Sequence, residues 1–280
     1  MFNVLPGGGR EVGEPIGRHP DVAMVSFTGS TETGRLFLHY AAESNLKRVV
    51  LECGGKNPAV VLKDVDCLET VAQSVVAGAF WNMGENCSAS SRLIVHEDIK
   101  DELLRQIGIQ LQEWQMGDPL DPQYQLGSLV SQAHFDKVRS YIEQAHAEKL
   151  TVVHGGTAEN NFVAPTVVDG VGPDSRLFRE EIFGPVLGIT TFTEIDEAIA
   201  LANDSVYGLA ASVYTSNLNS ALRLSREIRA GVVTVNCFGE GDVTTPFGGY
   251  KESGFGGRDK SQWAHDQYTE LKTIWIDTPR

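Results

Sequence analysis

The feature that most constrains the fold is an alternation of short apolar segments with amphipathic segments along almost the whole chain. The first apolar segments are AMVSFTG (23–29), KRVVLECG (47–54) and NPAVVLKD (57–64), and all three are rich in β-branched residues. After them, apolar residues such as Val71 and Val75 recur at helical spacing. This pattern predicts an α/β fold in which parallel strands are joined by crossover helices.

Later segments continue the same pattern. Further strands are predicted at RLIVHE (92–97), VLGITTFT (186–193), LAASVYT (209–215) and GVVTVNC (231–237), and we expect the last of these to be buried. The tail ELKTIWID (270–277) alternates apolar and polar residues, which predicts an edge strand.

Composition narrows the possible partners. The 280 residues carry 23 Lys and Arg against 37 Asp and Glu, a formal net charge of −14 that repels nucleic acid and anionic membranes. No apolar run approaches the roughly 20 residues of a spanning helix, and the first ten residues lack the apolar stretch of a secretion signal. We therefore expect a cytosolic protein without nucleic-acid or membrane partners.

The four cysteines, Cys53, Cys67, Cys87 and Cys237, are widely spaced and form no CxxC pair, so neither a disulfide framework nor a metal site is predicted. Three of them lie in or beside apolar segments, and we interpret these as buried structural thiols. Cys87 is different. Its run NMGENCSASS (82–91) leaves a predicted helix and surrounds the thiol with small polar residues and backbone amides suited to an oxyanion, so we predict a nucleophile there.

Glu52 stands inside the apolar run VVLEC and is followed at once by Gly54 and Gly55. Burial near an apolar pocket would raise its pKa toward the range of a general base. An acid at a strand end that reaches water explains the position equally well, so both interpretations remain open.

Two further pairs of residues are only weak evidence of a binding site when each is taken alone. Gly29 and Ser30 occupy a strand-to-helix turn of the kind that admits phosphate. Glu181 and Phe183 combine an acid with an aromatic ring near a Gly-Pro turn, a pairing suited to a ribose and a nicotinamide, although a solvated acidic turn is the simpler interpretation.

The glycine-rich loop at 238–261 is long enough to suggest a functional role. In it, Glu240 and Asp242 would attract a cationic substrate, or they are two solvated acids.

Together, the motifs FTGS, LECGGKNP, NMGENCSASSRL, EEIFGPVL, NDSVYGLAASVYT and PFGGYKESG, in this order and over essentially the whole chain, strongly resemble the aldehyde dehydrogenase superfamily. The endings GFGGRDKS and YTELKTIWI are similar to the branch that acts on aminoaldehydes, including γ-glutamyl-γ-aminobutyraldehyde. The resemblance implies oxidation of a small aldehyde to a carboxylate with NAD or NADP. Acyl transfer to coenzyme A is disfavoured because Glu52 would supply a hydrolytic base.

The resemblance also implies roles for the residues singled out above. Cys87 would attack the aldehyde, and Glu52 would activate the water that hydrolyses the resulting thioester. Gly29 and Ser30 would lie beside the cofactor pyrophosphate and its nicotinamide half, with Glu181 on the nicotinamide ribose. Phe183 would lie against the nicotinamide ring.

The implied fold is an incomplete Rossmann-type nucleotide-binding domain (1–53) and a complete α/β catalytic domain (54–237). The last part (238–280) would contain the glycine-rich loop, return to the nucleotide-binding domain and end in an oligomerisation strand.

Some positions depart from the family pattern. Glu85 replaces the usual glutamine before the nucleophile, and we expect its side chain to point outward; His134 replaces a glutamine near the ribose, and Cys53 a leucine. The Pro-Trp-Asn-Phe-Pro stretch, whose asparagine completes the oxyanion hole, does not occur in this sequence. We therefore expect a truncated chain with little turnover, derived from a parent that forms homo-oligomers. The alternative is a non-catalytic remnant that acts only in subunit association.

Overall fold

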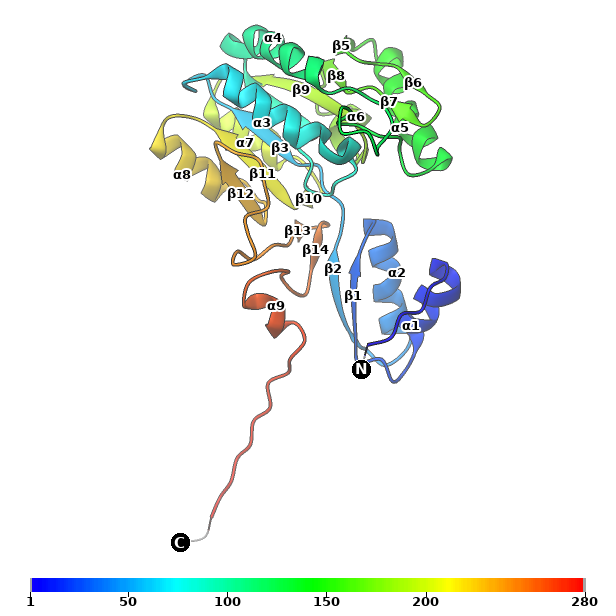
Figure 1. Cartoon of the computed structure of the whole chain (residues 1–280). Coiled ribbons are helices and arrows are strands. Elements are labelled where there is room, and N and C mark those ends of the chain that lie inside the picture. The colour runs from blue at the N-terminus through cyan, green and yellow to red at the C-terminus, as the bar shows by residue number, and fades with distance from the viewer. Residues whose placement is uncertain (1, 279–280) are drawn as a thin grey trace.

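The computed structural model describes residues 2–278 and contains two main sheets (Figure 1). The large sheet has the order β12-β11-β3-β4-β9-β8-β5, and all neighbouring pairs are parallel except β8 with β5. Its strands are β3 (Pro58–Val61), β4 (Arg92–His96), β5 (Thr151–His154), β8 (Thr166–Asp169), β9 (Val186–Phe192), β11 (Ala210–Tyr214) and β12 (Val232–Val235). The predicted parallel α/β fold is thus confirmed.

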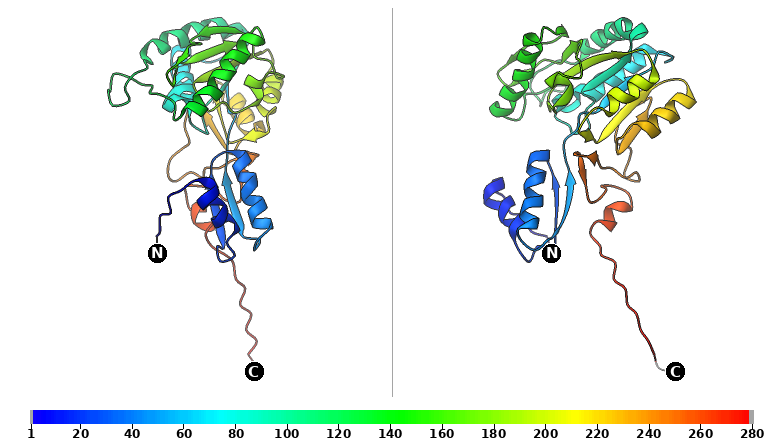
Figure 2. Two further views of the ribbon diagram at one scale, coloured as in Figure 1. Left: turned by 90° about the vertical axis from the view of Figure 1, so that its right-hand side faces the viewer. Right: turned by 180° about the vertical axis from the view of Figure 1, so that it is seen from behind.

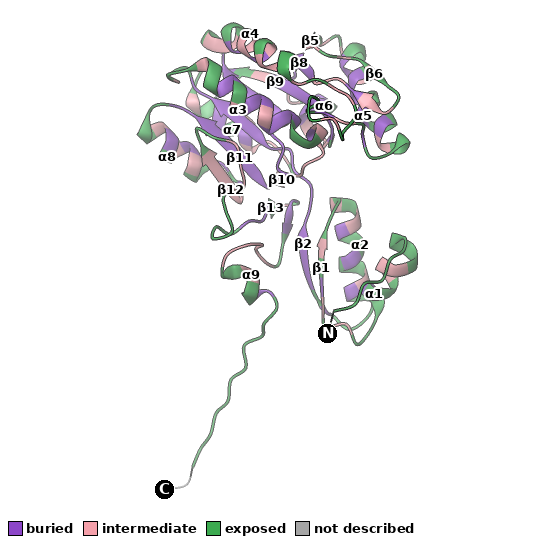
Figure 3. Cartoon of the chain, viewed as in Figure 1, coloured by how far each residue is buried: buried purple, intermediate pink, exposed green. Residues whose placement is uncertain are grey.

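Helices cover both faces of the large sheet (Figures 1 and 2). They are α3 (Leu68–Phe80), α4 (Lys100–Gln110), α5 (Gln132–Ala147), α6 (Arg176–Arg179), α7 (Ile195–Asn203) and α8 (Leu218–Glu227). Because successive side chains of a strand point to opposite faces, Val61 packs with α3 and α4 whereas Val60 packs with α7 and α8. Burial on both faces explains why β3, which lies inside the sheet, is apolar throughout, and the central strands are drawn as buried in Figure 3.

The small sheet has the order β1-β2-β14 and combines both ends of the chain. Its strands are β1 (Met24–Thr28), β2 (Arg48–Glu52) and β14 (Gly254–Phe255), and β2 pairs parallel with β1 but antiparallel with β14. Helix α2 (Thr31–Ala42) connects β1 to β2 and packs Phe37 and Ala41 against them. Before β1 lie a π-helical turn (Gly9–Gly13) and α1 (Glu14–Arg18).

Short elements complete the structure. β6 (Ala158–Glu159) pairs with β7 (Phe162–Val163), β10 (Tyr207–Gly208) pairs with β13 (Tyr250–Lys251), and α9 (Trp263–Asp266) follows β14. The change from the small sheet to the large one falls between β2 and β3, next to the boundary predicted at residues 53 and 54. The division into domains itself stays a prediction.

The C-terminal segment differs from the prediction. Residues 270–277 form no strand and run away from the rest of the molecule (Figure 1). Leu271, Ile274 and Trp275 are among the exposed large apolar side chains. A strand exists only through hydrogen bonds to a neighbouring strand, and no such neighbour lies beside this segment within residues 2–278.

Burial was also predicted wrongly at three places. Cys53 is buried as expected, but Cys67 and Cys237 are exposed. Cys67 lies at the N-cap of α3, and Cys237 follows the left-handed residue Asn236 just after β12. Strand β12 is only half-buried, because it forms an edge of the large sheet and lacks a neighbour on one side.

Candidate active site

A cavity of about 450 Å³ gathers side chains from distant parts of the chain. It is lined by Thr28, Gly29, Ser30, Glu52, Cys53, Gly54, Glu85, Asn86, Cys87, His134, Lys137, Glu181 and Phe183. Residues that directly follow β1 and β2 contribute one wall, as is common for ligand sites at the carboxyl ends of parallel strands. The six residues predicted for catalysis and cofactor binding all line this one cavity.

The backbone before Cys87 makes a sharp turn. Helix α3 ends at Phe80, and in the 3-10 turn Trp81–Gly84 both Asn82 and Met83 adopt positive φ. Gly84 also has a positive φ of 67°, and a side chain there would collide with the carbonyl of Gly184. The turn thereby aims the chain after α3 into the cavity.

Asn57 holds the nucleophile segment in place, although we did not single it out from the sequence. Its Nδ2 donates to the carbonyl oxygens of Cys87 (2.8 Å) and Ala89 (3.0 Å), and its Oδ1 accepts from the amide of Ala210 (2.9 Å). The side chain is buried. It connects the residues before β3 to the Cys87 segment and to β11, and a buried amide next to an apolar strand was the available signal.

Gly54 and Gly55 leave room for the side chain of Glu181 and for the backbone of Cys87. A methyl group at Gly54 would collide with the carboxylate of Glu181, and one at Gly55 would collide with the carbonyl of Cys87. The amide of Gly55 also donates to Glu181 Oε1 (3.0 Å). Two residues without side chains therefore allow the acid and the nucleophile segment to approach the same backbone from both sides.

Glu52 lies at the end of β2 and is buried, and its Oε2 has no hydrogen-bond partner within the described chain. Burial raises the pKa of Glu52 to about 8; the charge of Asp259 raises it further, and Arg258 opposes these effects. This burial favours the interpretation as a general base over that of a strand-end acid that reaches bulk water.

Ser253 fixes the position of β2, and it too was not predicted as a site residue. Its carbonyl accepts from the amide of Cys53 (2.8 Å), its Oγ donates to the carbonyl of Gly54 (2.6 Å), and its Oγ accepts from the amide of Gly208 (3.0 Å). Ser253 is fully buried. The motif PFGGYKESG therefore contributes a hydroxyl that ties the base strand to β10.

The Cys87 thiol is protonated at rest. Burial raises its pKa to about 11, and the carboxylates of Glu240, Glu181 and Glu52 raise it as well, whereas the amide of Ser88 lowers it. A base in the cavity is therefore needed to form the thiolate. Glu52, which lines the same cavity with a pKa near neutrality, is a carboxylate suited to that task.

The expectation that Glu85 points outward is wrong. Its side chain lines the cavity, with Oε1 accepting from the amide of Val130 (3.2 Å) and lying 3.3 Å from His134 Nε2. His134 Nε2 is also 2.6 Å from the carbonyl oxygen of Phe183. The carboxylate is thus engaged by His134 and Val130 on the wall of the cavity.

The remaining walls fit the nicotinamide half of a dinucleotide. Ser30 caps α2, accepting from the amide of Thr33 (3.2 Å), so that the start of a helix faces the cavity beside Gly29. Burial raises the pKa of Glu181, whose Oε1 accepts from the amide of Gly55, and Phe183 leaves part of its ring exposed. A half-buried acceptor for hydroxyl groups, an aromatic face and a helix start suit a ribose, a nicotinamide ring and a phosphate.

The two acids predicted for the substrate lie outside the lining of this cavity. Glu240 Oε1 accepts from the Oγ of Ser88 (2.7 Å), next to Cys87 in the chain. Asp242 Oδ1 instead accepts from the amide (2.7 Å) and Oγ1 (2.6 Å) of Thr244, in an exposed turn. The structure therefore brings Glu240 close to the nucleophile segment and leaves Asp242 in the loop.

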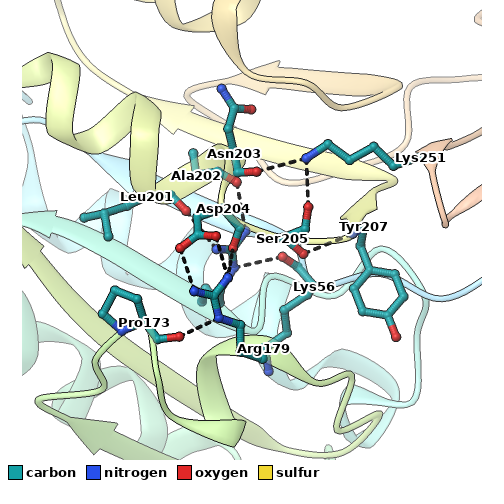
Figure 4. A network of polar contacts seen from close by, with 11 residues as sticks. Lys56, Pro173, Arg179, Leu201, Ala202, Asn203, Asp204, Ser205, Tyr207 and Lys251 are labelled. Carbon is teal, nitrogen blue, oxygen red and sulfur yellow. Dashed lines mark hydrogen bonds and ion pairs between the residues drawn. The ribbon is translucent and has the colours of Figure 1, made fainter.

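Arginine and lysine side chains hold the segment Asn203–Tyr207, from the motif NDSVYG, in place (Figure 4). Arg92 donates to the carbonyls of Leu201 and Ala202, and Lys251 Nζ donates to those of Asn203 and Ser205 (both 2.9 Å). Arg179 Nη2 pairs with Asp204 (2.8 Å). Cations at the C-terminus of α7 satisfy its free carbonyls, and Lys251 connects this segment to the glycine-rich loop.

No cluster of three or more His, Cys, Asp or Glu side chains within residues 2–278 is arranged to hold a metal ion. The same part of the chain has no helix that is long and apolar enough to cross a membrane.

Comparisons with known proteins show which family the chain is similar to. The model of the aldehyde dehydrogenase family matches residues 1–274. The chain is 77% identical to aminoacetaldehyde dehydrogenase of Pseudomonas aeruginosa and 47% identical to the NADP/NAD-dependent aldehyde dehydrogenase PuuC of Escherichia coli, and each alignment covers 99% of this chain. It spans 56% of the length of both relatives.

Among solved structures, an indole-3-acetaldehyde dehydrogenase with NAD⁺ superposes with a TM-score of 0.96 at 47% identity, over 99% of this chain and 57% of that one. Both the order of the motifs and the arrangement of the elements are therefore shared with enzymes of one family. The chain belongs to the aldehyde dehydrogenase family.

Proposed function

We propose that this chain supplies the nucleophile, the base and the nicotinamide side of an enzyme that oxidises aldehydes to carboxylates with NAD or NADP. The observation that carries the proposal is that Cys87 and Glu52, far apart in sequence, line one cavity together with Glu181 and Phe183. The relatives' names support both the reaction and the choice of cofactor. Because the chain spans 56% of their length, the activity of a whole enzyme is part of the proposal.

In the proposed reaction, the sulfur of Cys87 attacks the aldehyde carbonyl after its proton passes to a base in the cavity, for which Glu52 is suited. A nicotinamide held beside Glu181 and Phe183 would supply the acceptor for the hydride of the former aldehyde carbon, and loss of this hydride would leave a thioester on Cys87. Glu52 releases the proton of the thiol to solvent, takes a proton from water as a carboxylate, and the resulting hydroxide replaces the sulfur to release the acid. The thiol is regenerated when the proton returns to sulfur.

Four residues would hold the cofactor. Glu181 would accept hydrogen bonds from the nicotinamide ribose, and Phe183 would flank the ring. Gly29 and Ser30 would admit the pyrophosphate at the start of α2. The sequence has no Trp-Asn-Phe-Pro stretch to complete the oxyanion hole, and loss of one such donor costs about 10²–10³ in rate. We therefore expect weak dehydrogenase turnover from this chain.

Ester hydrolysis tests the nucleophile without the cofactor. The chain is expected to hydrolyse para-nitrophenyl acetate through an acyl group on Cys87, and Cys87→Ala is expected to lose at least about tenfold of the rate. The exposed Cys67 provides the matched control Cys67→Ala, which is expected to keep it. If Cys87→Ala hydrolyses the ester as fast as the parent chain, the assignment of the nucleophile is wrong.

The proposed substrate class is aminoaldehydes. The 77% identical relative is named for aminoacetaldehyde, and Glu240 lies beside Ser88, so its carboxylate would attract a substrate ammonium. Asp242 would add a longer-range attraction from the loop.

An aldehyde that occupies Cys87 protects this thiol from alkylation, so protection by aminoacetaldehyde can be compared with protection by propanal. The parent chain is expected to prefer the amine, and the preference is expected to fall in Glu240→Gln and less in Asp242→Asn. Equal protection by both aldehydes in all three chains would contradict the proposal.

Subunit association is the second proposal, and it is compatible with catalysis. The exposed apolar side chains of residues 271–276 favour contact with another copy of the chain, as in a homo-oligomer. The predicted cytosolic location stays a prediction that fractionation of the source cells would test.

A further inference from the structure

A chain of polar contacts leads from the nucleophile segment to the glycine-rich loop. Ser88, which follows Cys87 and is buried, donates its Oγ to Glu240 Oε1 (2.7 Å). The other oxygen of Glu240, Oε2, lies 3.2 Å from Lys260 Nζ. Lys260 thus reaches the neighbour of the proposed nucleophile through one carboxylate.

The position of Lys260 is fixed by its own surroundings. The preceding residue, Asp259, exchanges two backbone hydrogen bonds of 2.7 Å with Phe247, and Lys260 Nζ lies 5.2 Å from the centre of the Phe247 ring. The side chains of Lys260 and Glu240 are each 32% exposed. The ion pair is therefore partly shielded, unlike most surface pairs.

Three carboxylates act on the Cys87 thiol. Glu240 has the largest effect of the three, followed by Glu181 and Glu52. Glu181 accepts a hydrogen bond from the amide of Gly55, and the pKa of Glu52 near 8 keeps that carboxyl mostly neutral at neutral pH. The other ionisable side chains that line the cavity are Cys53, Glu85, His134 and Lys137.

We propose that Lys260 is a positioning residue for the proposed nucleophile, because it holds Glu240 against Ser88 and offsets the negative charge that this carboxylate places near Cys87. The inference rests on the proposed function only in treating Cys87 as the nucleophile. It predicts effects of opposite sign. Loss of the Lys260 charge leaves Glu240 uncompensated and disfavours the thiolate, whereas loss of the Glu240 charge favours it.

The rate of alkylation of Cys87 by iodoacetamide reads out this effect without any cofactor. At a fixed pH below the pKa of the thiol, a change of about 1 in that pKa changes the thiolate fraction about tenfold. The opposing change in intrinsic nucleophilicity reduces the change in rate to about threefold. Mass spectrometry of the peptide that contains Cys87 separates this reaction from alkylation of the other three cysteines.

The two main variants are expected to change the rate of alkylation in opposite directions. Lys260→Met is expected to slow alkylation of Cys87 about threefold, and Glu240→Gln, which keeps a side chain able to contact Ser88, is expected to speed it about threefold. Lys260→Arg keeps the charge and is expected to stay close to the parent. Lys63→Met and Asp98→Asn break an exposed ion pair of 3.4 Å that follows the carboxyl ends of β3 and β4, whereas Cys87 precedes the amino end of β4, and they serve as matched controls without effect.

The proposal is supported if alkylation of Cys87 slows in Lys260→Met and speeds up in Glu240→Gln, while the other three variants react at about the parent rate. Any other pattern overturns it. The two main variants test one claim with opposite signs, so either one with its matched control decides it should the other fail to fold. Ester hydrolysis by Cys87→Ala is a separate measurement. If Cys87→Ala hydrolyses the ester as fast as the parent chain, the proposed function is wrong, whereas the alkylation pattern still decides the role of Lys260.

Discussion

The Glu52 carboxyl and the Cys87 thiol are both ionisable groups that the fold removes from water. Burial is the first cause of each raised pKa, about 8 for Glu52 and about 11 for Cys87, so both groups are mostly protonated at neutral pH. The carboxyl is the stronger acid of the two and becomes the available base as the pH rises. We therefore expect ester hydrolysis that depends on Cys87 to increase as the pH rises through about 8.

Replacement of Glu52 separates activity from stability. In Glu52→Gln, formation of the acyl group on Cys87 is expected to slow because the thiol loses its base, and release of the acyl group is expected to slow about a hundredfold because the water loses the same base. The folded pKa of Glu52 is raised above the ordinary 4.5. Its contribution to stability is therefore fully present below about 4.5 and is lost as the pH rises through about 8.

Above that pH, Glu52→Gln is expected to gain stability relative to the parent, and the rise in pKa sets an upper limit of about 5 kcal/mol on this gain, which solvent in the cavity reduces. Urea unfolding on both sides of this pH range measures the difference. A variant that is equally stable relative to the parent at every pH would contradict the raised pKa.

Among the elements, β2 carries the proposed base and is held from both sides. β1 pairs with it in parallel, and β14 pairs with it antiparallel, with Gly254 opposite Glu52. Ser253 stands directly before β14 and bonds the backbone of Gly54, which lines the cavity, and of Gly208 in β10. The position of the base therefore depends on two residues about two hundred positions later in the chain.

Ser253→Ala is expected to destabilise the fold by about 1–3 kcal/mol, because the carbonyl of Gly54 and the amide of Gly208 would lose a buried partner. Release of the acyl group from Cys87 is expected to slow as well, since the end of β2 is less firmly held. Ser140→Ala, at a half-buried serine of α5 whose Oγ donates to the carbonyl of Lys137 within the same helix, is the control and is expected to change stability little. Equal unfolding midpoints for the two variants would show that Ser253 does not brace β2.

For the whole molecule, the candidate site is lined by residues next to the small sheet and by residues from the part of the chain that forms the large sheet, while the C-terminal segment stands apart from both sheets (Figure 2). Leu271, Ile274, Trp275 and Ile276 are all more than two thirds exposed. β1 also presents an edge with a neighbour on one side only. Exposed apolar side chains and an open strand edge both favour association between chains.

The chain is therefore expected to self-associate, and the double substitution Ile274→Lys and Ile276→Lys is expected to shift it toward smaller species in sedimentation velocity. Leu120→Lys removes an equally exposed apolar residue elsewhere on the surface and serves as the control. If the double variant sediments like the Leu120→Lys control, the tail does not mediate association.

Local pattern by itself determined the elements and the residue types of the site. Period-2 and period-3.6 arrangements of apolar residues identified the main strands and crossover helices, because these periods follow from backbone geometry. The flanks of Cys87 and the acid inside the apolar β2 strand marked two chemically unusual positions. The combination of ordered motifs then pointed to the family, which the comparisons confirmed.

The positions of those residues relative to one another follow from the folding of the whole chain. One cavity brings together Cys87, Glu52 and Glu181. They lie there because the end of β2, the segment after α3 and the segment after α6 all border this cavity. The inward position of Glu85 follows from His134 and Val130 in the same way. The tail could not be predicted correctly, since alternation describes a strand's two faces but not whether a neighbour exists to pair with it. Contacts between distant residues, and the presence or absence of a partner, are properties of the folded chain that no local pattern contains.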